Sequence, residues 1–149
     1  MILTMSLPQE ELLSRLRDAI AKGPRLRLLV LFGSHATGRT RASSDVDIGI
    51  VPLEADMPFG EELALASTLS AATGTEVDIV RLDDVPPLLG REVARSGVCV
   101  FEVSPGVFAA WRAGAMSRWF DFDETIAPHR ARFLQRLAAG ARGAGGGRP

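Results

Sequence analysis

Residues 26–52 read LRLLVLFGSHATGRTRASSDVDIGIVP and contain two apolar runs joined by a polar connection. The first run, Leu26–Phe32, is almost wholly apolar and ends at Gly33, which favours a buried strand over a helix. The second run, Val46–Val51, begins within an Asp-x-Asp sequence and ends at Pro52. The residues between them are rich in Gly, Ser, Thr and Arg. This stretch therefore predicts a strand, a polar loop and a second strand with acidic residues at its head.

The sequence on either side alternates between helical and strand patterns. Apolar residues recur at helical spacing over 7–22, where Gly23-Pro24 ends the run, and over 61–72, which ends near Gly74. The other expected elements are a strand at 75–80, a helix at about 88–96 and a strand at 97–103. Strands interleaved with helices predict an α/β or α+β fold.

The C-terminal third is predicted to be helical. One helix is expected from about Pro105 onward and a second from about Ala127 to Ala138. The last ten residues, 140–149, contain five glycines and two arginines and are expected to form a disordered tail. We therefore expect a single domain over residues 1–139.

Composition narrows the classes of function. The chain has 149 residues, with 17 basic and 18 acidic side chains and a net charge of −1, so direct nucleic-acid binding is not expected. We find neither a signal peptide nor an apolar run near the ~18–20 residues that span a bilayer. Cys99 is the only cysteine, which excludes an internal disulfide, and the two histidines are far apart in the sequence. A cytoplasmic protein without membrane association is expected.

Two carboxylates at the head of the second strand carry the chemistry. Side chains alternate along a strand, so Asp45 and Asp47 project to one side and repel each other unless a cation neutralises them. Mg²⁺ is suited to this, because it binds oxygen ligands and commonly shares them with substrate phosphates. Gly33 allows the backbone to approach a phosphate closely, and Ser34 offers a hydroxyl and an N-cap for a short helix. The pattern predicts a site for a metal-bound nucleoside triphosphate.

A third carboxylate is expected from the next strand. Asp78 lies within the apolar sequence Val77-Asp78-Ile79-Val80, where an unpaired buried charge is costly, so a shared metal site is its expected partner. Glu76 lies on the same face but nearer the strand end. A lone Asp-x-Asp more often marks a solvated strand end. The full pattern, with ten residues between Ser34 and Asp45, is much rarer by chance.

These residues resemble the nucleotidyltransferase superfamily related to polymerase beta. The small size is similar to that of the minimal nucleotidyltransferases, in particular the MNT antitoxins encoded beside HEPN toxins. The resemblance covers roughly residues 10–135 and implies a small mixed β-sheet flanked by helices, as in the polymerase-beta palm. One departure is Thr37, because many relatives carry Arg before the glycine that Gly38 matches, and Arg39 or Arg41 is the expected substitute.

The resemblance also implies a reaction and roles for the site residues. A hydroxyl attacks the α-phosphate of ATP and pyrophosphate leaves, with two Mg²⁺ ions about 3.5–4 Å apart. Asp45 and Asp47 would ligate both ions, and Asp78 would ligate the ion on the attacking side and help deprotonate the hydroxyl. Gly33 and Ser34 would hold the β- and γ-phosphates. In the antitoxin family the acceptor is a tyrosine of a HEPN ribonuclease toxin, which AMP addition silences.

Two other functions remain open from the sequence. An adenylyltransferase acting on a small molecule such as an aminoglycoside usually has a larger helical domain, and only about 45 residues follow the last predicted strand here. An antitoxin that acts by binding alone would not need catalysis, and Thr37 keeps that hypothesis open. His35 is interpreted as a loop residue without a role, and Trp119 and Phe122 as core or interface residues.

Overall fold

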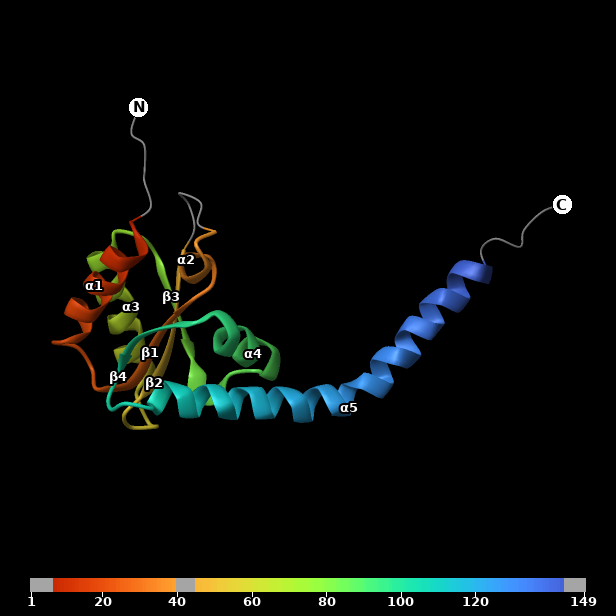
Figure 1. The fold of residues 1–149 in the computed structure, drawn as a ribbon. Helices are drawn as coiled ribbons and strands as arrows, with labels where there is room; N and C mark the ends of the chain where they lie inside the picture. Colours follow the sequence, from red (N-terminus) through yellow and green to blue (C-terminus); the bar gives the residue numbers. More distant parts are fainter. Residues whose placement is uncertain (1–6, 40–44, 144–149) are drawn as a thin grey trace, which may run out of the picture.

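The computed structural model describes residues 7–39 and 45–143. The elements in chain order are α1 (Gln9–Ile20), β1 (Leu26–Phe32), α2 (Ser34–Thr37), β2 (Val46–Pro52), α3 (Phe59–Thr73), β3 (Val77–Arg81), the 3-10 helix η1 (Leu82–Asp84), α4 (Pro87–Ser96), β4 (Val98–Glu102) and α5 (Val107–Gly143). The strands form one sheet in the order β3-β2-β1-β4, with β1 antiparallel to β2 and β4 and β2 parallel to β3. The predicted mixed sheet flanked by helices is confirmed (Figure 1).

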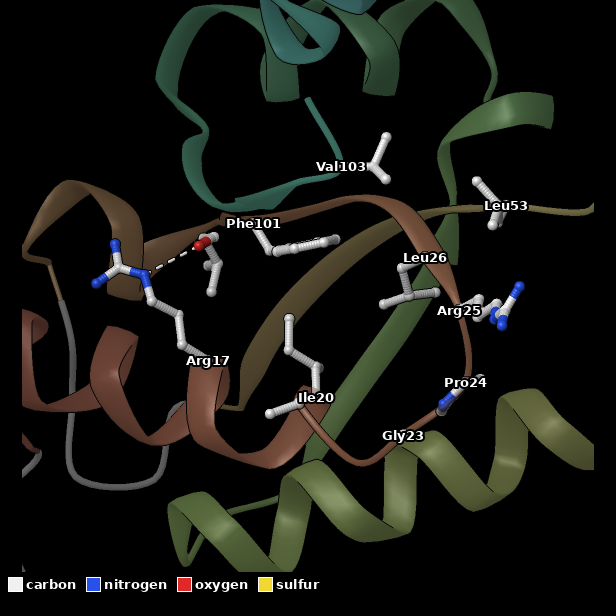
Figure 2. Close-up of a pocket in the computed structure, with 11 residues that line it drawn as sticks. Arg17, Ile20, Gly23, Pro24, Arg25, Leu26, Leu53, Phe101 and Val103 are labelled. Atoms are coloured by element: carbon white, nitrogen blue, oxygen red, sulfur yellow. Dashed lines mark hydrogen bonds between the residues drawn. The ribbon is translucent and has the colours of Figure 1, made fainter. Parts of the chain in front are cut away.

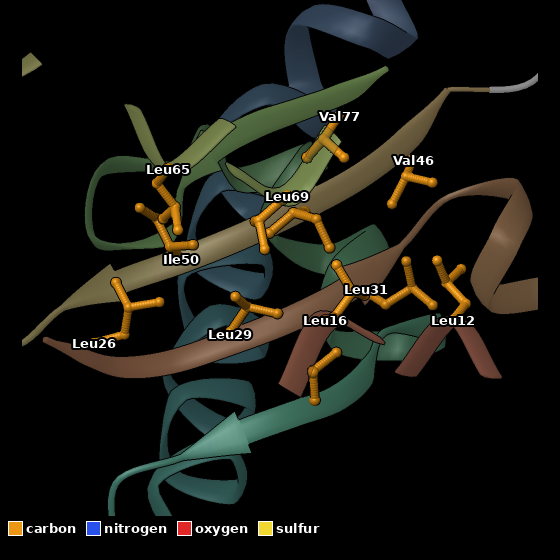
Figure 3. Packing of buried hydrophobic residues seen from close by; sticks show 12 residues of the cluster. Leu12, Leu16, Leu26, Leu29, Leu31, Val46, Ile50, Leu65, Leu69 and Val77 are labelled. Atoms are coloured by element: carbon orange, nitrogen blue, oxygen red, sulfur yellow. The ribbon is translucent and has the colours of Figure 1, made fainter. Parts of the chain in front are cut away.

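One face of the sheet packs against α1 and α3. Alternate residues of β1 and β2 point to this side, as the period of two along a strand requires. They meet apolar side chains that recur every four residues on the two helices, so that each helix buries one face. Figure 3 shows this cluster, whose fully buried members include Leu12, Leu16, Leu29, Leu31, Ile48, Ile50, Leu65 and Leu69.

The other face of the sheet packs against η1, α4 and the first part of α5. Leu28, Val30 and Phe32 of β1 point to this side and contact Leu82 and Val93. The Trp111 indole of α5 also ties this layer together, because its Nε1 donates a hydrogen bond to the Leu82 carbonyl oxygen at 3.0 Å. The sheet is therefore the middle of three layers, and both of its faces are covered.

The C-terminal region differs from the prediction of two helices and a tail beginning at residue 140. One helix, α5, runs from Val107 to Gly143 and contains Pro128. Proline lacks the N–H of one helical hydrogen bond and commonly bends a helix without ending it. Figure 1 shows α5 bending along its length. Residues 140–143 are thus helical, and the remainder of the predicted tail lies outside the described residues.

Candidate active site

The end of β1 and the starts of β2 and β3 lie at the same end of the sheet. Because β1 and β2 are antiparallel, the end of β1 at Phe32 lies beside Asp47 near the start of β2. Because β2 and β3 are parallel, the start of β3 lies at the same edge. The short helix α2 follows β1 directly at this point and contacts both β1 and β2.

Asp47 and Asp78 are directly opposite each other in the pairing of β2 with β3. Side chains at paired positions point to the same face of the sheet, so the two carboxylates lie side by side. Asp45 directly precedes β2, two residues before Asp47. The expectation that Asp78 is buried is wrong: it is exposed, because β3 is an edge strand and Asp78 lies on the face opposite to that of Val77, which packs in the cluster with α3. The argument for a bound cation therefore rests on the repulsion between Asp78 and the neighbouring Asp47 and not on burial of Asp78.

The electrostatics of the site centre on Asp47. Burial raises the pKa of the Asp47 carboxyl above its usual value, and the negative charges of Asp78 and Asp45 raise it further. His35 opposes this shift through its own charge interaction with Asp47. A carboxyl whose pKa is raised by neighbouring carboxylates has the electrostatics of a cation-binding site, because a bound cation removes the repulsion.

Gly33 is required by the carboxylate next to it. Its φ angle is +75°, in the left-handed region that favours glycine, and a Cβ built there would overlap the Asp47 carboxylate oxygen Oδ2. The sequence interpretation assigned the absence of a Cβ to the approach of a phosphate. The structure shows that the space is needed first by Asp47, so Gly33 sets the position of the carboxylate as well as the path of the loop.

Ser34 is the first residue of α2 and not its N-cap, as the sequence suggested. Gly33 occupies the N-cap position and, as a glycine, has no side chain that could cap the helix. Thr37 closes the other end of the turn, because its Oγ1 donates to the carbonyl oxygens of Gly33 at 3.4 Å and Ser34 at 3.3 Å. Thr37 therefore has a structural role in the turn that carries Gly33 and Ser34.

Two residues that the sequence interpretation did not select support this loop. His35 is buried, with 8% of its surface exposed, and its charge acts on Asp47. Gln9, at the start of α1, donates from Nε2 to the carbonyl oxygens of His35 at 3.3 Å and Ala36 at 3.0 Å. The sequence could have indicated a role for His35, because it directly follows Gly33-Ser34. It could not have indicated one for Gln9, which lies 26 residues from His35.

The donor set suits a cation that arrives with a phosphate ligand. Within residues 7–39 and 45–143, three or more His, Cys, Asp or Glu side chains do not gather closely enough to hold a metal ion by themselves. Mg²⁺ does not need such a group, because it usually takes one or two carboxylates and completes its shell with water and substrate phosphates. The paired carboxylates of Asp47 and Asp78, with Asp45 beside them, supply that part of the shell.

A pocket of about 560 Å³ lies at the opposite end of the sheet. Figure 2 shows it between the end of α1, the turn at Gly23-Pro24, the start of β1 and Phe101 of β4. The Arg17 guanidinium at its edge donates from Nε to the Val100 carbonyl oxygen at 3.0 Å. Since β1 starts at this pocket and ends at the carboxylates, the pocket is not part of the candidate active site.

Within residues 7–39 and 45–143, none of the helices has an apolar stretch of the length that crosses a bilayer. In solved structures, this chain is similar to a toxin–antitoxin complex with AMP-PNP, with a TM-score of 0.69 and 23% identity over 86% of this chain and 99% of that one. It is also similar to a complex of tri-AMPylated Shewanella oneidensis HEPN toxin with MNT antitoxin, with a TM-score of 0.62 and 21% identity over 85% of this chain and 95% of that one. At these identities the likeness establishes the fold.

Sequence comparison gives the family. The protein adenylyltransferase MntA of Shewanella oneidensis is 31% identical over 91 residues, which are 61% of this chain and 63% of that protein. The match thus spans somewhat less than two thirds of that relative's length, and it confirms the resemblance to MNT proteins drawn from the sequence. The family model described as "Polymerase beta, Nucleotidyltransferase" matches residues 14–105, which include Gly33, Ser34 and all three carboxylates. The chain belongs to the polymerase beta nucleotidyltransferase family.

Proposed function

We propose that this protein transfers AMP from ATP to a tyrosine of a partner HEPN ribonuclease toxin, in a Mg²⁺-dependent reaction, and so acts as the toxin's antitoxin. The observation that carries the proposal is the pairing of Asp47 with Asp78 across β2 and β3, with Asp45 beside them. Paired carboxylates beside a Gly-Ser loop, in a member of this family, fit the binding of a metal ion whose remaining ligands come from a triphosphate. The name of the Shewanella oneidensis relative supports protein adenylylation in particular.

The proposed roles follow from the positions of the residues. Asp45, Asp47 and Asp78 would hold two Mg²⁺ ions, which when bound neutralise charge on the phosphates and on the attacking and leaving oxygens. Asp78 is exposed at the edge strand, where a large acceptor has access, and it receives the proton of the tyrosine hydroxyl. Gly33 and Ser34 hold the β- and γ-phosphates. The tyrosine oxygen forms a bond to the α-phosphorus, the bond from that phosphorus to the bridging oxygen breaks, and pyrophosphate leaves.

The identity of the acceptor is supported by three observations. The chain has no tyrosine, so it is not its own acceptor on this residue type. One solved complex with the same fold contains an AMPylated HEPN toxin, and another contains the ATP analogue AMP-PNP. The exposed position of Asp78 suits a protein acceptor better than a small molecule enclosed in a pocket. Because ATP is the proposed donor, the proposed location of the protein is the cytoplasm.

The test is the intact mass of the HEPN-type protein encoded nearby, after incubation with this protein, ATP and Mg²⁺. We expect a gain of one or more AMP units, located on a tyrosine by peptide mapping and abolished by EDTA or by Asp45→Asn. The matched control is Asp18→Asn, an exposed aspartate on α1, which should leave the gain unchanged. A stable complex with the toxin but no mass gain would overturn the proposal and favour an antitoxin that acts by binding alone.

A further inference from the structure

The two edge strands of the sheet differ in how their outer edges are protected. At the β4 edge, the register shifts between Leu29 and Val30 of β1, which leaves Val100 of β4 without a partner residue, as in a β-bulge. The Val100 carbonyl oxygen accepts a hydrogen bond from Nε of Arg17 at 3.0 Å. Bulges and charged side chains are common means by which proteins prevent another chain from pairing with an edge strand. The β4 edge is therefore protected.

The opposite edge, formed by β3, lacks this protection. β3 pairs with β2 in continuous register from Val77 to Arg81, without a bulge, and it contains no proline. Its basic residue, Arg81, forms ion pairs with Asp83 at 2.8 Å and with Glu62 at 3.9 Å, so this guanidinium is engaged within the molecule. The β3 edge is thus one to which a further strand can add.

The pairing with β2 shows which backbone groups of β3 face outward. The Val46 N–H donates to the Glu76 carbonyl oxygen at 2.9 Å, so the backbone of Glu76 and of every second residue after it faces β2. Val77 and Ile79, at the alternate positions, face away from β2. The Val77 N–H donates to the Ser70 hydroxyl at 3.0 Å, whereas no hydrogen bond from another described segment reaches the N–H or the carbonyl oxygen of Ile79. Another chain can therefore bond to Ile79 through both groups.

The candidate site lies next to this open edge. Asp78 directly precedes Ile79 and points to the face of the sheet that carries Asp47. In an antiparallel strand bonded to Ile79, the residue opposite Asp78 points to the same face, with the two Cβ atoms about 4.5–5.5 Å apart. That pair is a non-hydrogen-bonded one, in which facing side chains approach most closely. A tyrosine at this position projects beside the carboxylates.

We propose that the acceptor segment of the protein substrate binds as an added antiparallel strand at the β3 edge, with its tyrosine opposite Asp78. This inference rests on the proposed function, because it specifies how the acceptor of that reaction is presented. Main-chain hydrogen bonds to Ile79 then select a tyrosine in an extended segment, and no pocket for the ring is needed. A few such bonds hold the segment weakly, which allows the modified tyrosine to leave.

The first test is Ile79→Pro, which removes the outward N–H at a position where an edge strand tolerates proline. We expect kcat/KM for the HEPN-type toxin to fall about 10-fold or more, while the Kd for ATP, measured without the toxin, stays unchanged. The matched control is Ile79→Ala, which loses side-chain packing but keeps the N–H, and it should modify the toxin at close to the wild-type rate. A wild-type rate for Ile79→Pro would overturn this inference alone. Absence of a mass gain with the wild-type chain would instead refute the proposed function.

Hydrogen exchange, measured by NMR on the full chain, tests the inference without a substitution. In the free protein the Ile79 amide should exchange faster than those of Asp78 and Val80, which bond to β2. In the presence of the toxin and a non-hydrolysable ATP analogue, exchange at Ile79 should slow by about 10-fold or more, while exchange in β4 should not change. Formation of the complex without protection of Ile79 would overturn the proposal and place the acceptor elsewhere.

Discussion

Asp47 lies where the function of the site conflicts with the stability of the fold. Burial and the charges of Asp78 and Asp45 raise the pKa of its carboxyl in the folded protein above the usual value of 3.8. A carboxyl with a raised folded pKa stabilises the fold only while it is protonated. That contribution is complete below the unfolded pKa and is lost as the pH rises through the folded pKa. At neutral pH the ionised Asp47 therefore destabilises the protein, unless a cation is bound.

From this we expect Asp47→Asn to make the ligand-free protein more stable while abolishing AMP transfer. The melting temperature at pH 7 should rise by roughly 1–3 °C, measured by differential scanning calorimetry in EDTA. The gain should shrink as the pH is lowered below the folded pKa, because the wild-type carboxyl then becomes neutral. Asp18→Asn is the control and should change neither quantity. A lower melting temperature for Asp47→Asn would contradict the electrostatic account.

The sequence predicted the carboxylates of the candidate site, but not the exposure of Asp78 or the position of His35. Asp45 and Asp47 were selected from the spacing of the Asp-x-Asp sequence after Gly33-Ser34, and Asp78 because it lies within an apolar strand. The structure pairs Asp47 with Asp78 across β2 and β3. The exposure of Asp78 was not predictable, because a strand's own residues do not reveal whether it lies at the edge of the sheet. His35 was set aside because one histidine in a loop gives no signal until the fold brings it close to Asp47.

At the scale of elements, the attachment of α2 to α1 fixes the loop that carries Gly33 and Ser34. α2 has only four residues, too few to hold a position through its own hydrogen bonds. Gln9 supplies two bonds from α1, and α1 is itself anchored in the core by Leu12 and Leu16. The position of the loop that carries Gly33 and Ser34 thus depends on a helix that is distant from it in sequence.

We expect Gln9→Leu to weaken ATP binding more than it slows the chemical step. The substitution preserves much of the side-chain volume but removes both hydrogen bonds to α2. Steady-state kinetics of toxin AMPylation should show the KM for ATP rising ~3–10-fold with a smaller change in kcat, since misplacement of a binding loop acts on positioning. Arg15→Leu on the same helix removes only an exposed pair with Glu11 and serves as the control. An unchanged KM for ATP would show that α2 holds its position without Gln9.

The sequence predicted closely the elements whose ends are marked by neighbouring residues. It did not predict the features that depend on residues distant in the sequence. β1 runs from Leu26 to Phe32 as predicted, because its apolar run is bounded by a charged segment and by Gly33. β2 continues one residue beyond the expected Val51. The expectation of a separate helix from about Ala127 was wrong: Pro128 lies inside α5, where a proline that faces solvent costs one hydrogen bond and a bend without ending the helix.

At the scale of the whole molecule, the three-layer body and the projecting half of α5 have separate sources of stability. The body buries two clusters of apolar side chains, one on each face of the sheet. Residues 127–141 are exposed throughout, so they bury little against that body. The stability of the chain should therefore reside almost wholly in residues before the projecting segment.

This separation predicts the effect of ending the chain after Ile126. The truncated protein should melt within about 2 °C of the full chain, because the removed residues contribute few native contacts. Differential scanning calorimetry of the two proteins at equal concentration measures the difference. A truncated protein that melts much lower would show that the projecting helix stabilises the body directly.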